Sequence, residues 1–316
     1  MIERISELLK HDTAGDPMTE LKWTHRTTAR VADELRGVGI DVGPRTVARL
    51  LGEMGYSLRV NHKQLARVSK TSPEERNAQF EHIAALREDF TARGLPVISI
   101  DTKKKELIGR FKNEGRAWSR KAIAVNDHDF PSDALGKAIP YGIYDVAANA
   151  GTLFVGTSRE TAAFAVQCLE RWWLDEGRQR YCDANELLIL ADGGGANGSR
   201  SRNWKLELHE RLALCHGLRV TVAHYPPGTS KWNPIEHRLF SEISKNWAGQ
   251  PLDSYETVLN YIRTTATKTG LTVCAHLVDR EYGKPSKITD AQMRALPIDW
   301  HKSMPRWNYS LKPAAV

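Results

Sequence analysis

The chain has 316 residues, of which 41% are hydrophobic and 26% are charged, a globular balance that excludes a disordered chain, a collagen and a coiled-coil rod. No stretch approaches the roughly 18 apolar residues that a membrane helix needs, and residues 1–20 lack the apolar core of a secretory signal. The four cysteines form no C-x-x-C pair, which disfavours a disulfide framework and a structural zinc site and favours a reducing cytoplasm.

Positive charge is the strongest compositional feature of the chain. Lys and Arg total 45 against 38 Asp and Glu, which gives a net charge of +7. The excess is concentrated, since residues 22–70 hold ten basic and four acidic residues and residues 101–121 hold eight and three. This distribution favours a polyanionic partner, with nucleic acid as the first candidate.

Two short helices are predicted near the N-terminus. Thr27-Thr28 caps the first, which runs to about residue 36, and the second opens at Gly43-Pro44 and ends at Gly55. The second helix has one apolar face, formed by Val47, Leu50, Leu51 and Met54. Helix, short glycine-bearing turn and helix in succession are the pattern of a helix-turn-helix motif.

Arg45 and Arg49 lie on the opposite, polar face of the second helix. Together with the surrounding positive charge they predict a DNA recognition helix. The alternative is a solvated helical hairpin with ordinary surface arginines. A further helix over residues 72–93, which starts strongly at Ser72-Pro73-Glu74-Glu75, is expected to link this region to the rest.

From Val97 onward the apolar pattern is that of strands separated by helices. The expected strands cover residues 97–100, 141–144, 152–156, 186–191 and 218–223, and the expected helices cover residues 158–173, 202–215, 233–247 and 255–267. Thr157 or Ser158 is the expected cap of the first of these helices. The order predicts an α/β fold with a mixed sheet flanked by helices, followed by a polar tail.

Three acids stand at informative places in this pattern. Asp101 ends the first strand, Asp192 follows the fourth, and Glu236 lies in the first turn of the helix that Asn233-Pro234 opens. If the first and fourth strands are neighbours, the two aspartates converge at a sheet edge, where α/β proteins commonly build sites. Three carboxylates in one cleft repel each other unless a cation joins them. Hard oxygen ligands select two Mg²⁺ or Mn²⁺ ions, which suits phosphoryl transfer.

Each acid also has a purely structural interpretation. Asp101 could pair with Lys103 or Arg110 at the surface, and Asp192 could shape a turn before the glycines that follow it. Glu236 stands three residues after Asn233, which is the spacing of a capping box. An acid at each expected element end favours the functional interpretation.

The run Gly193-Gly194-Gly195-Ala196-Asn197-Gly198 matches the dinucleotide-binding pattern G-x-G-x-x-G between a strand and a helix. An oxidoreductase is therefore a weaker alternative. Asp192 beside a pyrophosphate and the absence of an acid after the next strand count against it. The glycines are better explained by close approach of a nucleic-acid backbone.

Two further segments are candidate DNA contacts. In the loop before the last helix, Lys231 suits a phosphate and Trp232 suits stacking on a base, although a packing role for the tryptophan is equally open. Lys103, Lys104 and Lys105 form either a phosphate track or a solvated charge run.

At these residues the sequence resembles the DDE transposases of the ISAzo13 insertion-sequence family, which is loosely related to the IS630/Tc1-mariner group. The matching stretches are TVARLLGEMGYSL, PVISIDTKKKELIGRFKNEGRAW, HDFPSDALGKAIPYGIYDVAANAG, LLILADGGGANGSR and HYPPGTSKWNPIEHRLFSEISKNW. The resemblance covers residues 16 to 280, approximately, and its motifs are long.

This resemblance implies a ribonuclease-H-like core in which Asp101, Asp192 and Glu236 are the catalytic triad and bind two divalent ions. It implies double-stranded DNA as partner, a homodimer or higher oligomer on DNA, and a cytoplasmic, nucleoid-associated location. The expected domains are a helix-turn-helix region over 1–71, a linking helix over 72–95, the catalytic domain over 96–250 and a helical extension with a tail over 251–316. Since family members carry more chain ahead of this point, truncation of the first region is an expectation. A non-catalytic DNA-binding remnant of a transposase is the alternative.

Overall fold

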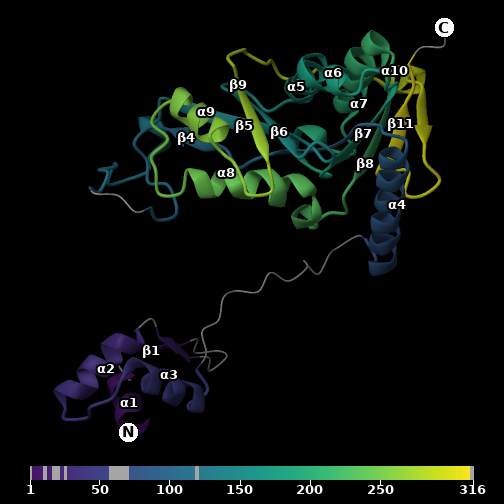
Figure 1. The fold of residues 1–316 in the computed structure, drawn as a ribbon. Coiled ribbons are helices and arrows are strands. Elements are labelled where there is room, and N and C mark those ends of the chain that lie inside the picture. Colours follow the sequence, from purple (N-terminus) through teal and green to yellow (C-terminus); the bar gives the residue numbers. More distant parts are fainter. Residues whose placement is uncertain are drawn as a thin grey trace. The chain divides into compact units, whose positions relative to one another are not determined.

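The computed structural model describes residues 2–9, 13–15, 22–24, 27–56, 71–117 and 121–313. The chain forms two compact units, Met1–Ala66 and Arg67–Val316 (Figure 1). Among the described residues, no helix has the length and apolarity needed to cross a membrane.

The first unit is mainly helical and has a small core of its own. It contains α1 (Ile2–Leu9), α2 (Thr28–Gly37), α3 (Pro44–Glu53) and a short antiparallel pair of β1 (Thr13–Gly15) and β2 (Lys22–Thr24). The Thr27 side chain accepts a hydrogen bond from the Arg30 N–H, so the predicted cap of α2 is confirmed. Val47 and Leu50 of α3 are buried with Leu35 of α2, as the apolar periodicity predicts.

The helix predicted as a link, α4 (Pro73–Ala92), packs against the sheet of the second unit. A capping box between Ser72 and Glu75 begins it. Its buried side chains Ile83 and Phe90 join a cluster with the strand residue Leu188. By its contacts α4 is therefore part of the larger unit.

A nine-stranded mixed sheet forms the centre of the larger unit. Its strands are β3 (Val97–Thr102), β4 (Glu106–Ile108), β5 (Gly136–Asp145), β6 (Ala150–Gly156), β7 (Glu186–Ala191), β8 (Arg219–His224), β9 (Thr272–Val278), β10 (Ile298–Trp300) and β11 (Asn308–Leu311). The spatial order is β10-β11-β8-β7-β3-β5-β6-β9, with β4 paired to β5. All five strands expected from the sequence are present.

The central strands combine antiparallel and parallel pairing. Strand β5 is antiparallel to β3 and β6, whereas β3, β7 and β8 are mutually parallel neighbours. The segment after residue 251, expected as a helical extension with a tail, adds strands at both edges of the sheet. Strand β9 pairs with β6 at one edge, and β11 and β10 extend the sheet beyond β8 at the other.

Helices cover both faces of this sheet (Figure 1). One face packs against α5 (Ala162–Trp172) and α7 (Arg202–Leu208), each of which continues into a π-helical turn, Trp173–Gly177 and His209–Leu214. The other face packs against α4 and, over β5 and β6, against the turn Glu236–Phe240 with α8 (Ser241–Asn246) and α9 (Tyr255–Arg263). The remaining helices are short: α6 (Arg178–Arg180) and α10 (Asp290–Ala295).

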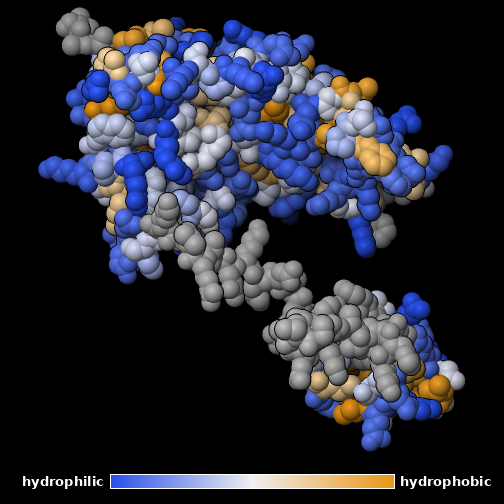
Figure 2. All heavy atoms as spheres, turned by 180° about the vertical axis from the view of Figure 1, so that it is seen from behind, coloured by the Kyte–Doolittle hydropathy of each residue, from blue (hydrophilic) through white to orange (hydrophobic). Residues whose placement is uncertain are grey.

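The cap of α5 differs from the one expected. Thr161 caps the helix, because its side chain accepts a hydrogen bond from the Phe164 N–H. The hydroxyls of Thr157 and Ser158 instead donate to Asp279 and to the Arg280 carbonyl, so the C-terminal segment uses them. On the face shown in Figure 2, hydrophilic residues cover most of the larger unit.

Candidate active site

Asp101 and Asp192 stand at the ends of two neighbouring parallel strands. In the register of β3 and β7, Ile100 lies opposite Ala191, so the residue that follows each of them reaches the same edge of the sheet. The expectation that these strands are neighbours is therefore confirmed, and the chain places the two carboxylates side by side at the carboxyl end of both strands.

Glu236 reaches this edge because its helix packs closely on β5. Gly142 of β5 lies opposite Asp101 in the antiparallel register. A Cβ at Gly142 would lie 2.5 Å from Phe240 Cε1 and 2.9 Å from Ile235 Cδ1. The bare backbone at Gly142 therefore lets the segment that carries Glu236 approach the strand of Asp101.

The three carboxyl groups act on one another electrostatically. Burial, together with the nearby carboxylates of Asp192 and Glu236, raises the pKa of Asp101 to about 8, whereas the Thr102 N–H, 2.7 Å from Asp101 Oδ1, opposes the shift. The Glu236 side chain contributes to this shift through its charge and through direct interaction with Asp101. Burial also raises the pKa of Asp192, against a hydrogen bond from Asn233 and with a contribution from Glu236. The structure thus brings together all three predicted acids.

The capping-box interpretation of Glu236 is wrong. The backbone N–H of Asn233 donates to the Ser230 carbonyl, and the Glu236 N–H donates to the Asn233 carbonyl rather than to its side chain. The Asn233 side chain is fully buried and faces the strands instead. The sequence analysis treated Asn233 as a helix start and missed its contact with β3. The polar Ser99 inside the otherwise apolar strand VISI was the available signal, because it bonds to the Asn233 side chain.

Lys103 is buried beside the acids rather than presented to solvent. Its ammonium lies 4.5 Å from the centre of the Trp247 ring and 3.7 Å from Glu106 Oε1. Burial lowers the pKa of Lys103, with Glu106 and Glu236 opposing the shift. A direct phosphate contact by Lys103 stays a prediction, and it would require the ammonium to leave the Trp247 ring.

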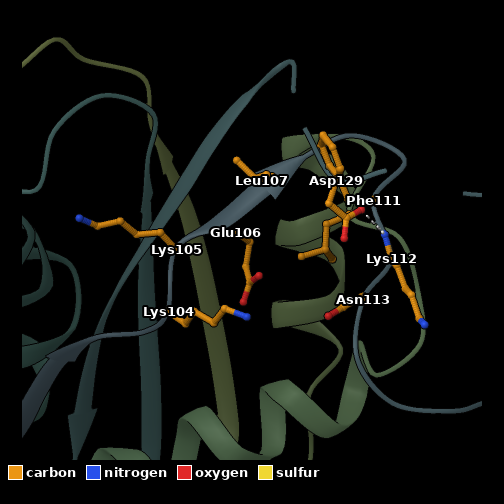
Figure 3. A pocket seen from close by; sticks show the side chains of 9 residues that line it. Lys104, Lys105, Glu106, Leu107, Phe111, Lys112, Asn113 and Asp129 are labelled. Atoms are coloured by element: carbon orange, nitrogen blue, oxygen red, sulfur yellow. Dashed lines mark hydrogen bonds between the residues drawn. The ribbon is translucent and has the colours of Figure 1, made fainter. Parts of the chain in front are cut away.

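The neighbouring lysines line an open pocket of about 190 Å³ (Figure 3). Phe111 and Leu252 supply apolar wall, and both are buried. The Lys104 side chain lies at the pocket, while Lys105 extends away from the other labelled side chains and its ammonium is 2.8 Å from Glu160 Oε2. Both lysines are exposed, and Lys105 is already paired with Glu160.

The loop before Glu236 exposes the two predicted DNA contacts. Trp232 is 60% exposed, its ring meets Phe80 of α4 edge-on, and the Lys231 ammonium lies 5.6 Å from its centre. In the first unit Arg45 and Arg49 are both exposed on α3, and Arg49 forms an ion pair with Glu53. Contact of any of these residues with DNA remains a prediction.

Buried polar contacts hold the glycine-rich loop after Asp192 in place. Asn197 Oδ1 accepts a hydrogen bond of 2.9 Å from the Tyr141 hydroxyl, and its carbonyl lies 2.8 Å from His224 Nε2. The strands on either side of this loop and α7, β7 and β8, are parallel neighbours, which is also the local arrangement of the dinucleotide fingerprint. The strand pairing therefore does not test the oxidoreductase alternative, which stays a weaker prediction.

The donor set at this sheet edge fits a hard divalent cation. It consists of carboxylate oxygens, and within the described part of the chain no ion pair involves Asp101 or Asp192. Among the same residues, no three Asp, Glu, His or Cys side chains are arranged as a ready metal site. The raised pKa of Asp101 reflects a buried concentration of negative charge that a cation would relieve.

Comparisons with solved structures find low similarity to a mariner-type transposase. A Mos1 transposase paired-end complex with the left transposon end is 14% identical, with a TM-score of 0.43, over 83% of this chain and 69% of that chain. A pre-cleavage Mos1 transpososome is 15% identical, with a TM-score of 0.44 and the same coverage. No curated protein matches this sequence significantly.

A family model gives the decisive comparison. The model described as the Rhodopirellula transposase DDE domain matches residues 4–313, nearly the whole chain, and it corresponds to the resemblance that the motifs around Asp101, Asp192 and Glu236 indicate. The chain therefore belongs to the family of the Rhodopirellula transposase DDE domain.

Proposed function

We propose that this protein is a metal-dependent DNA transposase whose catalytic acids are Asp101, Asp192 and Glu236 on a ribonuclease-H-like core. The observation that carries the proposal is the meeting of these three acids at one sheet edge, with electrostatic coupling among them. Membership of a transposase family supports the same interpretation. The runs β6-β5-β3 and β3-β7-β8, antiparallel and then parallel, are consistent with the proposed core.

Asp101, Asp192 and Glu236 would hold two Mg²⁺ or Mn²⁺ ions. When bound, such ions lower the pKa of the attacking hydroxyl and stabilise charge on the leaving oxygen of a phosphodiester. The residues contribute rigidity: Asp101 belongs to a central strand, and the Thr102 N–H holds one of its oxygens. Glu236 belongs to a helical turn that packs on the adjacent strand.

The proposed reaction has two chemically similar steps. A water oxygen attacks a phosphodiester at the element end, the bond to the 3′-oxygen breaks, and a free 3′-hydroxyl is released. That hydroxyl then attacks a phosphodiester of target DNA, so one P–O bond forms as another breaks. Lys104 and Lys231 would contact the backbone beside the acids, and the exposed Trp232 ring would stack on a base.

A cleavage assay on element-end DNA tests this proposal. Mg²⁺ or Mn²⁺ should support strand cleavage, and Ca²⁺ should support binding without turnover because its bonds are longer and its geometry looser. Glu236→Gln should lower cleavage about a hundredfold or more, since the amide is a poor ligand for a hard cation. Glu242→Gln is the matched control, because Glu242 lies in α8, directly after the turn that carries Glu236, and pairs with Lys245.

The outcomes separate the alternatives. Full cleavage in excess chelator would overturn the metal mechanism, and normal cleavage by folded Glu236→Gln would remove Glu236 from the triad. DNA binding without cleavage under every divalent ion would instead support a non-catalytic remnant of a transposase.

We propose further that α2 and α3 form a helix-turn-helix that grips the element end. The exposed positions of Arg45 and Arg49 on α3, opposite its buried Val47 and Leu50, support this. Replacing both arginines with Ala should weaken DNA binding and reduce its salt dependence by a slope of about one for each phosphate that the protein no longer neutralises. An unchanged affinity and salt slope would mean that α3 does not touch DNA.

A further inference from the structure

A fully buried amide, Asn233, lies at the junction of the segments that carry the three acids. Its Nδ2 group is 3.2 Å from the Ile100 carbonyl oxygen and 3.2 Å from Asp192 Oδ1, and it donates to both. Its Oδ1 accepts a hydrogen bond from the Ser99 hydroxyl. Both N–H bonds of the amide and its oxygen are therefore in use.

Ser99 completes this arrangement from inside β3. Its Oγ accepts a hydrogen bond of 3.0 Å from the backbone N–H of Ile235, which leaves its own proton free for Asn233. Because the amide nitrogen faces two oxygens, this orientation is the one that satisfies every partner. Loss of any one of these hydrogen bonds would leave a buried polar atom without a partner, which lowers the stability of the fold.

We propose that Asn233, supported by Ser99, is a positioning residue for the acid cluster. This inference rests on the proposed function. Asn233 holds the Asp192 carboxylate directly, and it binds the backbone of β3 at Ile100, the residue before Asp101. Through Ser99, which accepts a hydrogen bond from the Ile235 N–H, it also fixes the start of the turn Glu236–Phe240 against β3.

The neutral character of the amide is what suits it to this place. A lysine or arginine in contact with Asp192 would orient the carboxylate but would cancel the charge that a divalent cation requires. An amide N–H occupies one oxygen and leaves the charge of the carboxylate and its second oxygen available. Groups that orient metal ligands from behind typically change metal affinity 10–100-fold when they are removed.

Binding of Mn²⁺ to the full chain without DNA provides the test, with free Mn²⁺ followed by electron paramagnetic resonance. Asn233→Ala should weaken Mn²⁺ binding by about 10–100-fold. Ser99→Ala, which leaves the amide in place without its support, should weaken it by a smaller factor. In the cleavage assay, excess Mn²⁺ should restore cleavage by Asn233→Ala but not by Asp192→Asn, because Asn233→Ala keeps all three carboxylate ligands.

Asn308→Ala is the matched control for burial and stability. Asn308 is also a fully buried asparagine, and its amide donates to Gln79 and to the carbonyls of Ser303 and Met304 rather than to the acids. Its variant should lose stability while keeping the Mn²⁺ affinity of the unaltered chain.

Wild-type Mn²⁺ affinity in both folded Asn233→Ala and Ser99→Ala would overturn the positioning role and leave the metal site standing. An equal loss of affinity in Asn308→Ala would also overturn it, because the effect would then be general. If the unaltered chain and Asp192→Asn bind Mn²⁺ equally, the proposed function itself fails. Should Asn233→Ala not fold, Ser99→Ala decides by the same criterion.

Discussion

The two ends of the β3–β5 ladder hold carboxylates with very different surroundings, one fully buried and one half-buried. At one end Asp145 lies opposite Ile98, and at the other Asp101 lies opposite Gly142. Asp145 is fully buried, and its carboxylate is 2.6 Å from Arg180 Nη1, 2.9 Å from the Tyr181 hydroxyl and 3.1 Å from the Ala148 N–H. Asp101 has a single backbone donor, Thr102, and two other acids nearby.

This difference separates a structural acid, Asp145, from a candidate metal ligand, Asp101. The partners of Asp145 come from its own chain, so its charge is balanced when the protein folds. Asp101 lacks such a partner among the described residues, and its raised pKa expresses that imbalance. The surroundings of the two carboxylates, and not their places at strand ends, separate them.

The same substitution at both ends should have opposite effects, and the largest is expected at Asp101. Asp101→Asn keeps an oxygen to accept from the Thr102 N–H but removes the charge, so cleavage should fall about a hundredfold or more. Melting temperature measured in chelator should be unchanged or higher, because repulsion among the acids is relieved. Wild-type cleavage by this variant would erase the distinction between the two ends.

Asp145→Asn should chiefly cost stability. Removing the charge leaves Arg180 without its carboxylate and presents an amide to donors, which should lower the free energy of unfolding by about 3–4 kcal/mol. Denaturant unfolding measures this, and Mn²⁺ affinity should be retained. A large loss of Mn²⁺ affinity with little loss of stability would place Asp145 in the functional site.

Stability should also depend on pH through His224, which ends β8 opposite Ala191, the residue before Asp192. Burial lowers the pKa of His224 to about 4, although hydrogen bonds to the backbone carbonyls of Trp307 and Asn197 oppose the shift. Between pH 6.5 and 4 the unfolded chain therefore binds more protons at this histidine than the folded chain does. The contribution of neutral His224 to the free energy of unfolding is complete above pH 6.5 and is lost as the pH falls toward 4, by up to about 3 kcal/mol. Unfolding free energies of the unaltered chain and His224→Gln, compared across this range, should show a flatter dependence in the variant. Parallel curves would mean that His224 is not held neutral.

Gly142→Ala should produce the smallest effect and should sharpen the link between packing and site. The added Cβ meets Phe240 and Ile235, so the turn that carries Glu236 must shift, at about 1–2 kcal/mol of stability. Mn²⁺ affinity should fall as well. Gly283→Ala is the control, because a Cβ there has nothing within 4 Å. If Gly142→Ala binds Mn²⁺ normally, close packing on β5 does not set the position of Glu236.

Local patterns were sufficient to predict most individual elements. The apolar runs predicted β3, β7 and β8 closely, and the caps at Thr27 and Ser72 follow from side chains that bond to their own helix. Where a hydroxyl had a distant competitor the prediction failed, as at Ser158, which bonds to Arg280 rather than capping α5. The strands after residue 251 were missed because their partners lie far away in the chain.

The sequence by itself determined the family of the protein, most of its strands and helices before residue 251, and the three acids at element ends. Tertiary structure alone decided that Asp145 is neutralised by Arg180, that Lys103 is buried under Trp247, and that Asn233 faces the strands instead of capping a helix. The physical reason is that periodicity and caps act over a few residues. Burial and charge compensation, in contrast, depend on groups that meet only when the sheet and its covering helices assemble.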